Sequence, residues 1–86
     1  MSYHLKEIPK GVLGEFSKLI EEFEECKDSF EQGNKIMLLV ELSDFLGAME
    51  HYLKKNYGET ITIADLLEMT KATNRAFNSG HRKSKI

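Results

Sequence analysis

The sequence predicts an all-α fold: an antiparallel helical bundle of three to four helices that is completed by oligomerisation. Of the 86 residues, 41% are hydrophobic, 30% are charged and only one is proline, which is typical of helix-rich globular chains rather than of disordered ones. Apolar residues recur at spacings of three and four over long stretches. Glycine-containing breaks near residues 33 and 58 divide these stretches into three expected helices.

The first helix is expected from about residue 10 to residue 30. Its apolar residues fall on one stripe, which we expect to be buried with Phe23 at its centre; the stripe consists of Phe16, Leu19, Ile20, Phe23, Cys26 and Phe30. Pro9 is expected near the first turn, where its missing N–H costs nothing. Gly11 and Gly14 weaken this beginning of the helix.

The second helix is expected from about residue 35 to residue 55, after the stop and turn signal formed by Gly33 and Asn34. Its apolar residues cover nearly every direction around the axis, so we expect it to be buried on several sides. Gly58 then provides a left-handed cap. The third helix begins at one of the threonines that follow, where Thr62 and the residue three positions later resemble a capping box.

Length and composition predict one domain over residues 1–86, with a less ordered arm at 1–9 and a less ordered basic tail at 79–86. The formal net charge of −2 argues against nucleic-acid binding, and no apolar stretch is long enough to span a membrane. The single cysteine excludes an internal disulfide and a zinc motif, so a reducing cytoplasm is expected. The apolar central segment favours a homodimer or a homotetramer.

Two acidic pairs stand out, and in each pair the residues are three apart and therefore share a helix face. Glu22 and Glu25 belong to the first helix, whereas Glu41 and Asp44 interrupt an apolar run in the second. Burying unpaired carboxylates costs several kcal/mol each, so a positive group is expected beside Glu41 and Asp44. A buried ion pair or a solvent-open helix face would also explain these two residues, but not the matching spacing of the other pair.

In an antiparallel hairpin, the fifteen residues between Glu25 and Glu41 place the two pairs roughly level. Four carboxylates would then converge from two helices. An all-oxygen cluster suits hard octahedral ions, namely Mg²⁺ or Mn²⁺, which commonly hold substrate phosphates in such sites.

The string Glu21-Glu22-x-x-Glu25, fifteen residues and Glu41-x-x-Asp44 resembles the EExxE…ExxD signature of MazG-type, all-α nucleoside triphosphate pyrophosphohydrolases. The resemblance covers two of the expected helices and is greatest to small phage and prophage members. It implies that Glu22, Glu25, Glu41 and Asp44 are catalytic ligands of Mg²⁺, with Mn²⁺ as a substitute, and that Glu21 supports the ligands or orients a water as base. It also implies hydrolysis of an NTP or dNTP to the monophosphate and pyrophosphate, in dimers or tetramers.

Cationic and polar residues are needed to bind a triphosphate. Lys71, Asn74 and Arg75 share one face of the third helix, and the family carries a similar set near the substrate phosphates. Lys18, one turn before Glu22, is a further candidate. A solvated helix face explains the first three equally well, and a surface ion pair explains Lys18.

Two other functions are compatible with the same fold. The chain is either a nucleotide- and metal-binding regulatory module with negligible turnover, or a structural helical oligomer whose acidic pairs form salt bridges between chains. Binding without pyrophosphate release would identify the module. A thermal midpoint that Mg²⁺ leaves unchanged would identify the structural oligomer.

Overall fold

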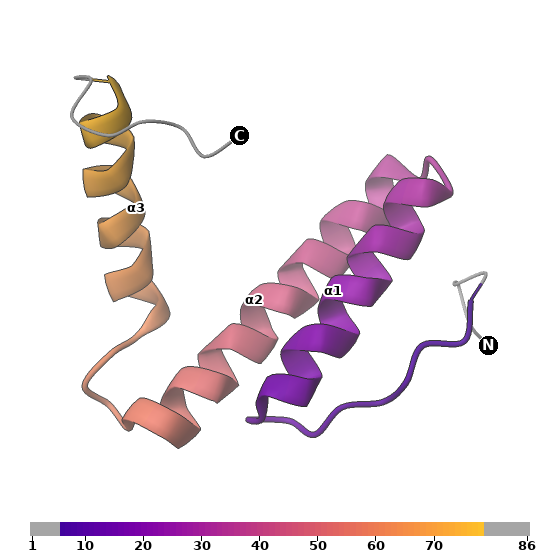
Figure 1. Cartoon of the computed structure of the whole chain (residues 1–86), viewed down its shortest axis with the longest axis horizontal. Coiled ribbons are helices and arrows are strands. Elements are labelled where there is room, and N and C mark those ends of the chain that lie inside the picture. Colours follow the sequence, from indigo (N-terminus) through magenta and orange to yellow (C-terminus); the bar gives the residue numbers. More distant parts are fainter. Residues whose placement is uncertain (1–5, 79–86) are drawn as a thin grey trace.

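The computed structural model of the protein describes residues 6–78, and this part of the chain contains three α-helices and no strand (Figure 1). The helices are α1 over Phe16–Glu31, α2 over Lys35–Tyr57 and α3 over Ile63–Asn78. The all-α fold is therefore confirmed. The predicted tail lies outside the described residues, as do the first five residues of the predicted arm.

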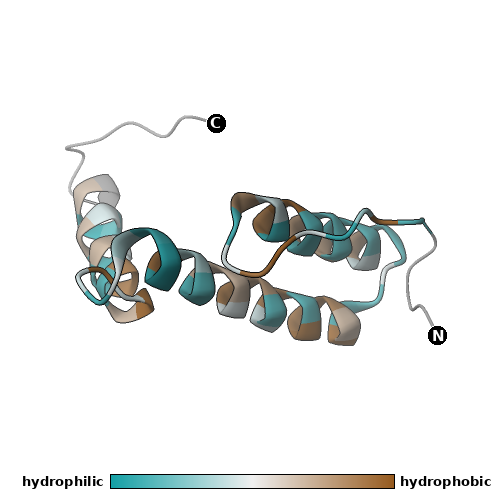
Figure 2. Ribbon diagram, turned by 90° about the horizontal axis from the view of Figure 1, so that it is seen from below, coloured by the Kyte–Doolittle hydropathy of each residue, from teal (hydrophilic) through white to brown (hydrophobic). Residues whose placement is uncertain are grey.

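The first two helices form an antiparallel hairpin and lie side by side along most of their length (Figures 1 and 2). The turn between them is short because α1 ends at Glu31 and α2 begins at Lys35. Asn34 is the N-cap of α2, and its side-chain oxygen accepts the Met37 N–H at 2.9 Å. Such a cap satisfies one of the free amides of the first turn. The predicted break at Gly33 and Asn34 is confirmed.

The start of α1 differs from the prediction, because the helix begins at Phe16 and not near residue 10. The preceding residues form an arm that runs along α1 (Figure 1), and Pro9 belongs to this arm rather than to a helical turn. Gly14 has a φ of +89°, which is left-handed and ends any continuous helix through this segment. The two glycines were expected only to weaken the start of the helix, but the segment that contains them is not helical at all.

The second and third helices are joined by a short capped linker. Gly58 follows α2 with a φ of +64°, as predicted. Thr62 and Asp65 form the predicted capping box: the Thr62 N–H donates to Asp65 Oδ2 at 2.8 Å, and the Asp65 N–H donates to Thr62 Oγ1 at 3.3 Å. Helix α3 packs against α2 only, and within the described chain it makes no contact with α1 (Figure 1).

The apolar core of the described chain is thin. Only Cys26, Ala48 and Leu53 are buried hydrophobic residues. The expectation that the α1 stripe is buried holds for Cys26 but is wrong for most of the stripe in a single chain, since Phe23 at its predicted centre is 53% exposed. The expected burial of α2 on several sides is equally wrong, because several of its large apolar side chains are exposed: Ile36, Leu39, Val40, Leu42 and Leu46. Apolar and polar residues are mixed along the helices (Figure 2).

Candidate functional site

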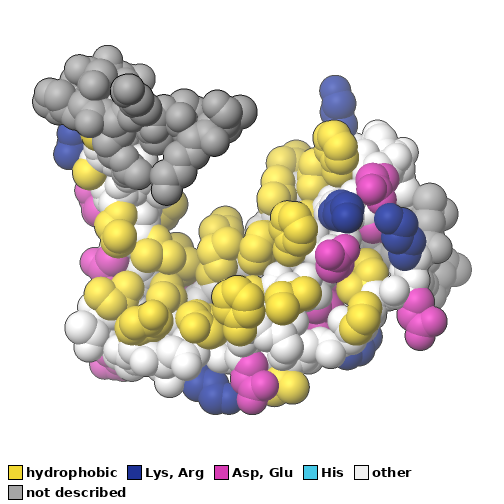
Figure 3. Space-filling view, viewed as in Figure 1, with side chains coloured by type: hydrophobic (Ala, Val, Ile, Leu, Met, Phe, Trp, Pro, Cys, Tyr) yellow, Lys and Arg dark blue, Asp and Glu magenta, His cyan; other side chains and the backbone are white. Residues whose placement is uncertain are grey.

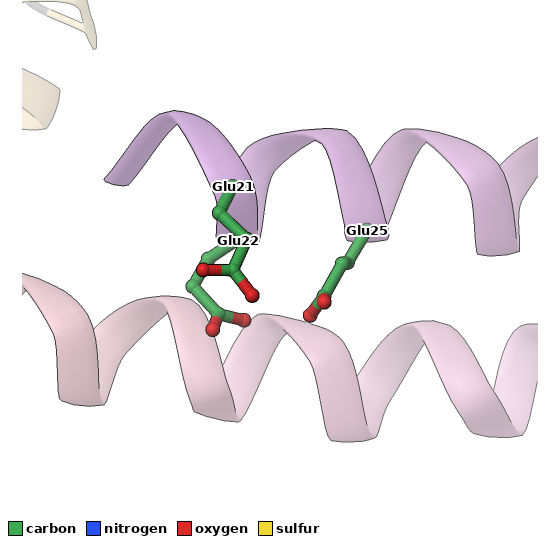
Figure 4. A group of neighbouring side chains, drawn as sticks. All are labelled: Glu21, Glu22 and Glu25. Atoms are coloured by element: carbon green, nitrogen blue, oxygen red, sulfur yellow. The ribbon is translucent and has the colours of Figure 1, made fainter. Parts of the chain in front are cut away.

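The hairpin buries acidic side chains where a helical pair usually buries apolar ones. Glu21, Glu22 and Glu25 extend from α1 toward α2 (Figure 4). Glu22 is only 6% exposed, and Glu41 on the facing helix is only 5% exposed. The sequence pattern placed Glu22 on the flank of a stripe centred on Phe23. The structure instead turns α1 so that Glu22 faces α2 (Figure 4), while Phe23 stays half exposed and its ring touches Phe45 at the margin of the helix pair.

The predicted ligands are brought together in two overlapping groups. Oxygen atoms of Glu21, Glu22 and Glu25 lie within 4.8 Å of one another, and the same holds for Glu22, Glu41 and Asp44. Glu22 belongs to both groups and therefore joins the acidic residues of the two helices. The antiparallel register expected from the fifteen intervening residues does place the two pairs level.

The cluster has a buried part and an open edge. Glu22 and Glu41 are buried, Glu25 is half-buried and Asp44 is exposed. The expectation that Asp44 is buried is therefore wrong, and at this residue the alternative of a solvent-open helix face holds, although its carboxylate still reaches Glu22 and Glu41. The cluster is therefore open to solvent on the side of Asp44.

Crowding of carboxylates alters their affinity for protons. Burial raises the pKa of Glu22, and the Glu25 carboxyl raises it further against the opposing effect of Lys18. Burial also raises the pKa of Glu25, and the neighbouring Glu41 adds to this rise. Burial and the surrounding carboxylates raise the pKa of the Cys26 thiol as well. The cluster is thus short of positive charge in the metal-free chain.

Lys18 supplies part of that charge. Its Nζ lies 3.1 Å from Glu21 Oε1 and 3.2 Å from Glu22 Oε1, and its side chain is only 25% exposed. The other oxygen of Glu22, Oε2, is buried and accepts no hydrogen bond from the described residues. A buried carboxylate oxygen without a donor is costly, and a cation would satisfy it.

Glu21 is mainly engaged with the N-terminal arm. Its Oε1 accepts the Gly11 N–H at 2.8 Å, and Lys10 Nζ lies 3.8 Å from its Oε2. Burial alone would raise the pKa of Glu21, but the Gly11 amide and the ammonium groups of Lys18 and Lys10 outweigh it and lower the pKa. An ionised carboxylate bonded in this way is suited to holding the arm in place more than to accepting a proton from water.

The tether between Glu21 and Gly11 was missed by the sequence reasoning, which placed Gly11 inside a weak helix. The arm passes so close to α1 that a Cβ on Gly11 would lie 2.3 Å from the Ser17 carbonyl oxygen. The Val12 N–H also donates to Ser17 Oγ at 3.0 Å. The pair of glycines at 11 and 14 was the available signal, because it is unfavourable for a helix and suits a close backbone approach.

The predicted phosphate-binding residues of α3 are not brought to the cluster within one chain. Lys71, Asn74 and Arg75 are exposed on a helix that contacts α2 but not α1 in the described structure. Lys71 Nζ pairs with Glu68 Oε1 at 3.1 Å on the same helix. Of the four substrate-binding candidates, only Lys18 adjoins the carboxylates.

The donor set fits a hard divalent cation. Four carboxylates from two helices converge, one of them offers a buried oxygen without a donor, and the cluster contains no imidazole or thiolate ligand among the described residues. Oxygen-only sites of this kind suit Mg²⁺ and Mn²⁺. Glu22, Glu25, Glu41 and Asp44 are the residues that would hold the ion.

Comparison with known proteins does not assign the chain to a family. No protein-family model matches it, and neither a curated protein nor a solved structure shows significant similarity to it. Within residues 6–78, none of the helices has both the length and the apolar character that crossing a membrane requires.

Proposed function

We propose that this chain is a Mg²⁺-dependent nucleoside triphosphate pyrophosphohydrolase that converts an NTP or dNTP to the monophosphate and pyrophosphate. The observation that carries the proposal is the convergence of Glu22, Glu25, Glu41 and Asp44 around a buried carboxylate oxygen that lacks a donor. The spacing of these residues resembles the signature of MazG-type enzymes, which supports the same reaction. A reducing cytoplasm is the proposed compartment, in keeping with the free Cys26.

The two parts of the cluster suggest different roles. When bound, Mg²⁺ would neutralise phosphate charge and lower the pKa of a nearby water. Glu22 and Glu41 are fixed in the helix interface and would anchor the ion. Asp44 lies at the open edge and would meet the ion on the side from which a triphosphate arrives. Glu21 would support this arrangement by holding Lys18 and the arm.

The proposal includes a homodimer or homotetramer. Lys71, Asn74 and Arg75 would then bind the phosphates held by the carboxylates of a neighbouring chain, because α3 makes no contact with its own α1. Arg75 is suited to gripping two phosphate oxygens at once, and Lys71 would act as a point charge.

A panel of NTPs and dNTPs with Mg²⁺ or Mn²⁺, monitored by pyrophosphate release, tests the activity. Glu41→Gln and Asp44→Asn are each expected to lower the rate about 100-fold or more while helicity is retained, since even residues that merely support a metal ligand cost 10–100-fold. Glu50→Gln is the matched control, because Glu50 is an exposed residue of α2 outside the cluster. Full activity in either cluster variant would refute the proposal.

A structural role is the second candidate, and the ion pairs of Lys18 with Glu21 and Glu22 favour it. In this case the carboxylates are neutralised by protein cations and need no metal. Mg²⁺ would then leave the thermal midpoint unchanged, whereas an ion that binds only the folded state raises it. Nucleotide binding in the presence of Mg²⁺ without pyrophosphate release would instead identify a regulatory module.

A further inference from the structure

The arm that precedes α1, over residues 6–15, is held by polar contacts more than by apolar packing. Basic and acidic side chains lie close together over the arm and α1, whereas hydrophobic side chains gather on the concave face of the molecule (Figure 3). Val12 and Leu13 in the arm are each 55% exposed. An open hollow of about 330 Å³ separates the arm at Pro9 from α1 at Ser17. The arm can therefore detach while exposing little additional apolar surface.

Glu21 anchors the arm and is also linked to the acidic cluster. Its Oε1 accepts the Gly11 N–H at 2.8 Å and a hydrogen bond from Lys18 Nζ at 3.1 Å. The same ammonium group lies 3.2 Å from Glu22 Oε1. One lysine thus joins the carboxylate that holds the arm to the carboxylate that belongs to both acidic groups. The contacts run without a break from the backbone of the arm to the cluster.

A cation in the cluster acts on both ends of this link. Glu22 Oε2, which is buried and has no donor among the described residues, points to such a ligand. A divalent ion held there repels the Lys18 ammonium, so that Glu21 loses a charged donor. The ion also attracts Glu21 itself, whose carboxylate oxygen lies within 4.8 Å of oxygens of Glu22 and Glu25. Both effects favour a shift of Glu21 toward the ion and away from the arm.

We propose that the arm is an autoinhibitory strap: it docks on α1 through Glu21 in the metal-free chain, and a divalent cation in the acidic cluster releases it. The coupling is reciprocal, so the docked arm lowers the affinity for the ion by the same factor by which the ion weakens docking. The inference rests on the ion binding that is part of the proposed function, but not on the hydrolysis of a nucleotide.

Release is confined to the part of the arm that precedes Gly14. The Gly14 carbonyl accepts a hydrogen bond from Asn56 Nδ2 at 3.3 Å, and Glu15 pairs with Lys55 at 3.3 Å. These contacts hold the end of the arm to α2 and do not involve the acidic cluster. Gly14 itself, with a φ of +89°, is a natural hinge between the anchored end and the released part.

Amide hydrogen exchange of the full chain, with a chelator and then with saturating Mg²⁺, measures docking of the arm. The Gly11 N–H is the reporter, because it is bonded to Glu21. The Met37 N–H, which donates to the side chain of Asn34 at 2.9 Å, is the matched control outside the cluster. Mg²⁺ is expected to speed exchange at Gly11 by about fivefold or more, the lower end of usual couplings between sites, and not to speed exchange at Met37.

Variants of the arm test the reciprocal effect, with Mg²⁺ binding measured by titration calorimetry. Gly11→Ala forces the arm away, since the new Cβ would lie 2.3 Å from the Ser17 carbonyl oxygen. It is expected to bind Mg²⁺ more tightly by the same factor of about fivefold or more. Gly47→Ala, which adds a Cβ in open space on α2, should keep the wild-type affinity. Ser17→Ala removes only the hydrogen bond to the Val12 N–H and should fall between the two.

The outcomes separate the strap from the proposed function. Unchanged or slower exchange at Gly11 in a chain that binds Mg²⁺ overturns the strap alone, as does wild-type Mg²⁺ affinity in both Gly11→Ala and Ser17→Ala. A wild-type chain that binds no Mg²⁺ overturns the strap and the proposed function together. Release of the arm by Mg²⁺ in a chain that yields no pyrophosphate supports the strap and refutes only the hydrolase.

Discussion

At the scale of single residues, the position of Lys18 raises the question of whether its ammonium group and a metal ion can bind the acidic cluster at the same time. Its ammonium group contacts an oxygen of Glu22, the carboxylate that belongs to both acidic groups. A cation bound by Glu22 and Glu41 would take over part of the role that Lys18 has in the metal-free chain. Under the proposed function, Lys18 and the ion would therefore compete for the same negative charge, and binding of the ion would free Lys18 to meet a phosphate.

Lys18→Met is expected to lower the free energy of unfolding of the metal-free protein by about 1–2 kcal/mol, because the buried carboxylates of Glu21 and Glu22 each lose an ion-pair partner. In saturating Mg²⁺ the deficit should shrink, so that the variant gains more stability from Mg²⁺ than the wild type does. Lys27→Met, a change at an exposed lysine of the same helix, is the control. Urea unfolding with a chelator and with Mg²⁺ measures both quantities. An equal or smaller gain in Lys18→Met would contradict competition.

The carboxylates also predict a pH dependence. Because the pKa values of Glu22 and Glu25 are raised above the ordinary value of 4.5, the folded chain holds these protons more tightly than the unfolded chain. The stability they contribute is complete below 4.5 and is lost as the pH rises through the raised values. The pKa of Glu21 is lowered, so the stability that Glu21 contributes is complete above pH 4.5 and is lost as the pH falls below this value.

For the metal-free protein, we therefore expect the free energy of unfolding to decrease from mildly acidic to neutral pH. Mg²⁺ should remove this decrease, because an ion binds the deprotonated carboxylates. Denaturant unfolding at a series of pH values, with a chelator and then with Mg²⁺, provides the measurement. A metal-free stability that rises over this pH range would show that Glu22 and Glu25 do not retain protons on folding.

At the scale of secondary-structure elements, the arm and α2 offer a matched pair of glycine substitutions. Gly11→Ala should cost roughly 1–3 kcal/mol, because the new Cβ would collide with the Ser17 carbonyl and displace the amide that binds Glu21. Gly47→Ala should instead stabilise the chain by about 0.5–1 kcal/mol, since Gly47 is inside α2 and has open space around it. Thermal unfolding followed by circular dichroism compares the two. Equal effects would mean that the arm is not held against α1.

Much of the element structure was predictable from local signals. The turn at Gly33 and Asn34, the cap at Gly58 and the capping box at Thr62 were all read correctly, because each depends on a few neighbouring residues. The start of α1 was misplaced, because the tether that holds the arm joins residues ten positions apart. Helical propensity carries no information about such a contact.

The convergence of the acidic residues was predicted, but the orientation of α1 was not, and the predicted α3 residues do not reach the cluster within one chain. Spacing showed that Glu22 and Glu25 share a face with each other, and the hairpin brings them to Glu41 as expected. The centre of the face of α1 that meets α2 was read wrongly, since it was taken at Phe23, which is half exposed and touches Phe45 of α2, whereas Glu22 and Cys26 are buried. Periodicity gives the angle between side chains around an axis, but the identity of the partner surface depends on the whole assembly.

At the scale of the whole molecule, the distance between α3 and the acidic cluster determines how many chains a working site needs. Residues of α3 cannot serve the carboxylates of their own α1 as the described chain is folded. A shared site would therefore combine the cluster of one chain with Lys71 and Arg75 of another. This arrangement follows from the proposed hydrolase and can be tested by mixing variants.

Asp44→Asn and Arg75→Gln should each be nearly inactive alone. Mixing them in equal amounts under conditions that exchange subunits should restore about a quarter of the wild-type pyrophosphate release, because half of the resulting dimers are mixed and each has one intact site of two. If each site lies within one chain, a mixed dimer has no intact site. The absence of any recovery, with exchange verified independently, would therefore exclude sharing between chains.

The carboxylates buried between α1 and α2 bear on how long the protein survives a protease. Cleavage of a small domain usually requires transient opening, and its rate follows the population of the opened form. In the metal-free chain, separation of the two helices relieves the repulsion among Glu22, Glu25 and Glu41. In a chain that holds an ion, the same separation would release the ion and would therefore be less favourable. The supply of free Mg²⁺ would then set the lifetime of the molecule as well as its activity, and a chain deprived of the ion would be degraded first.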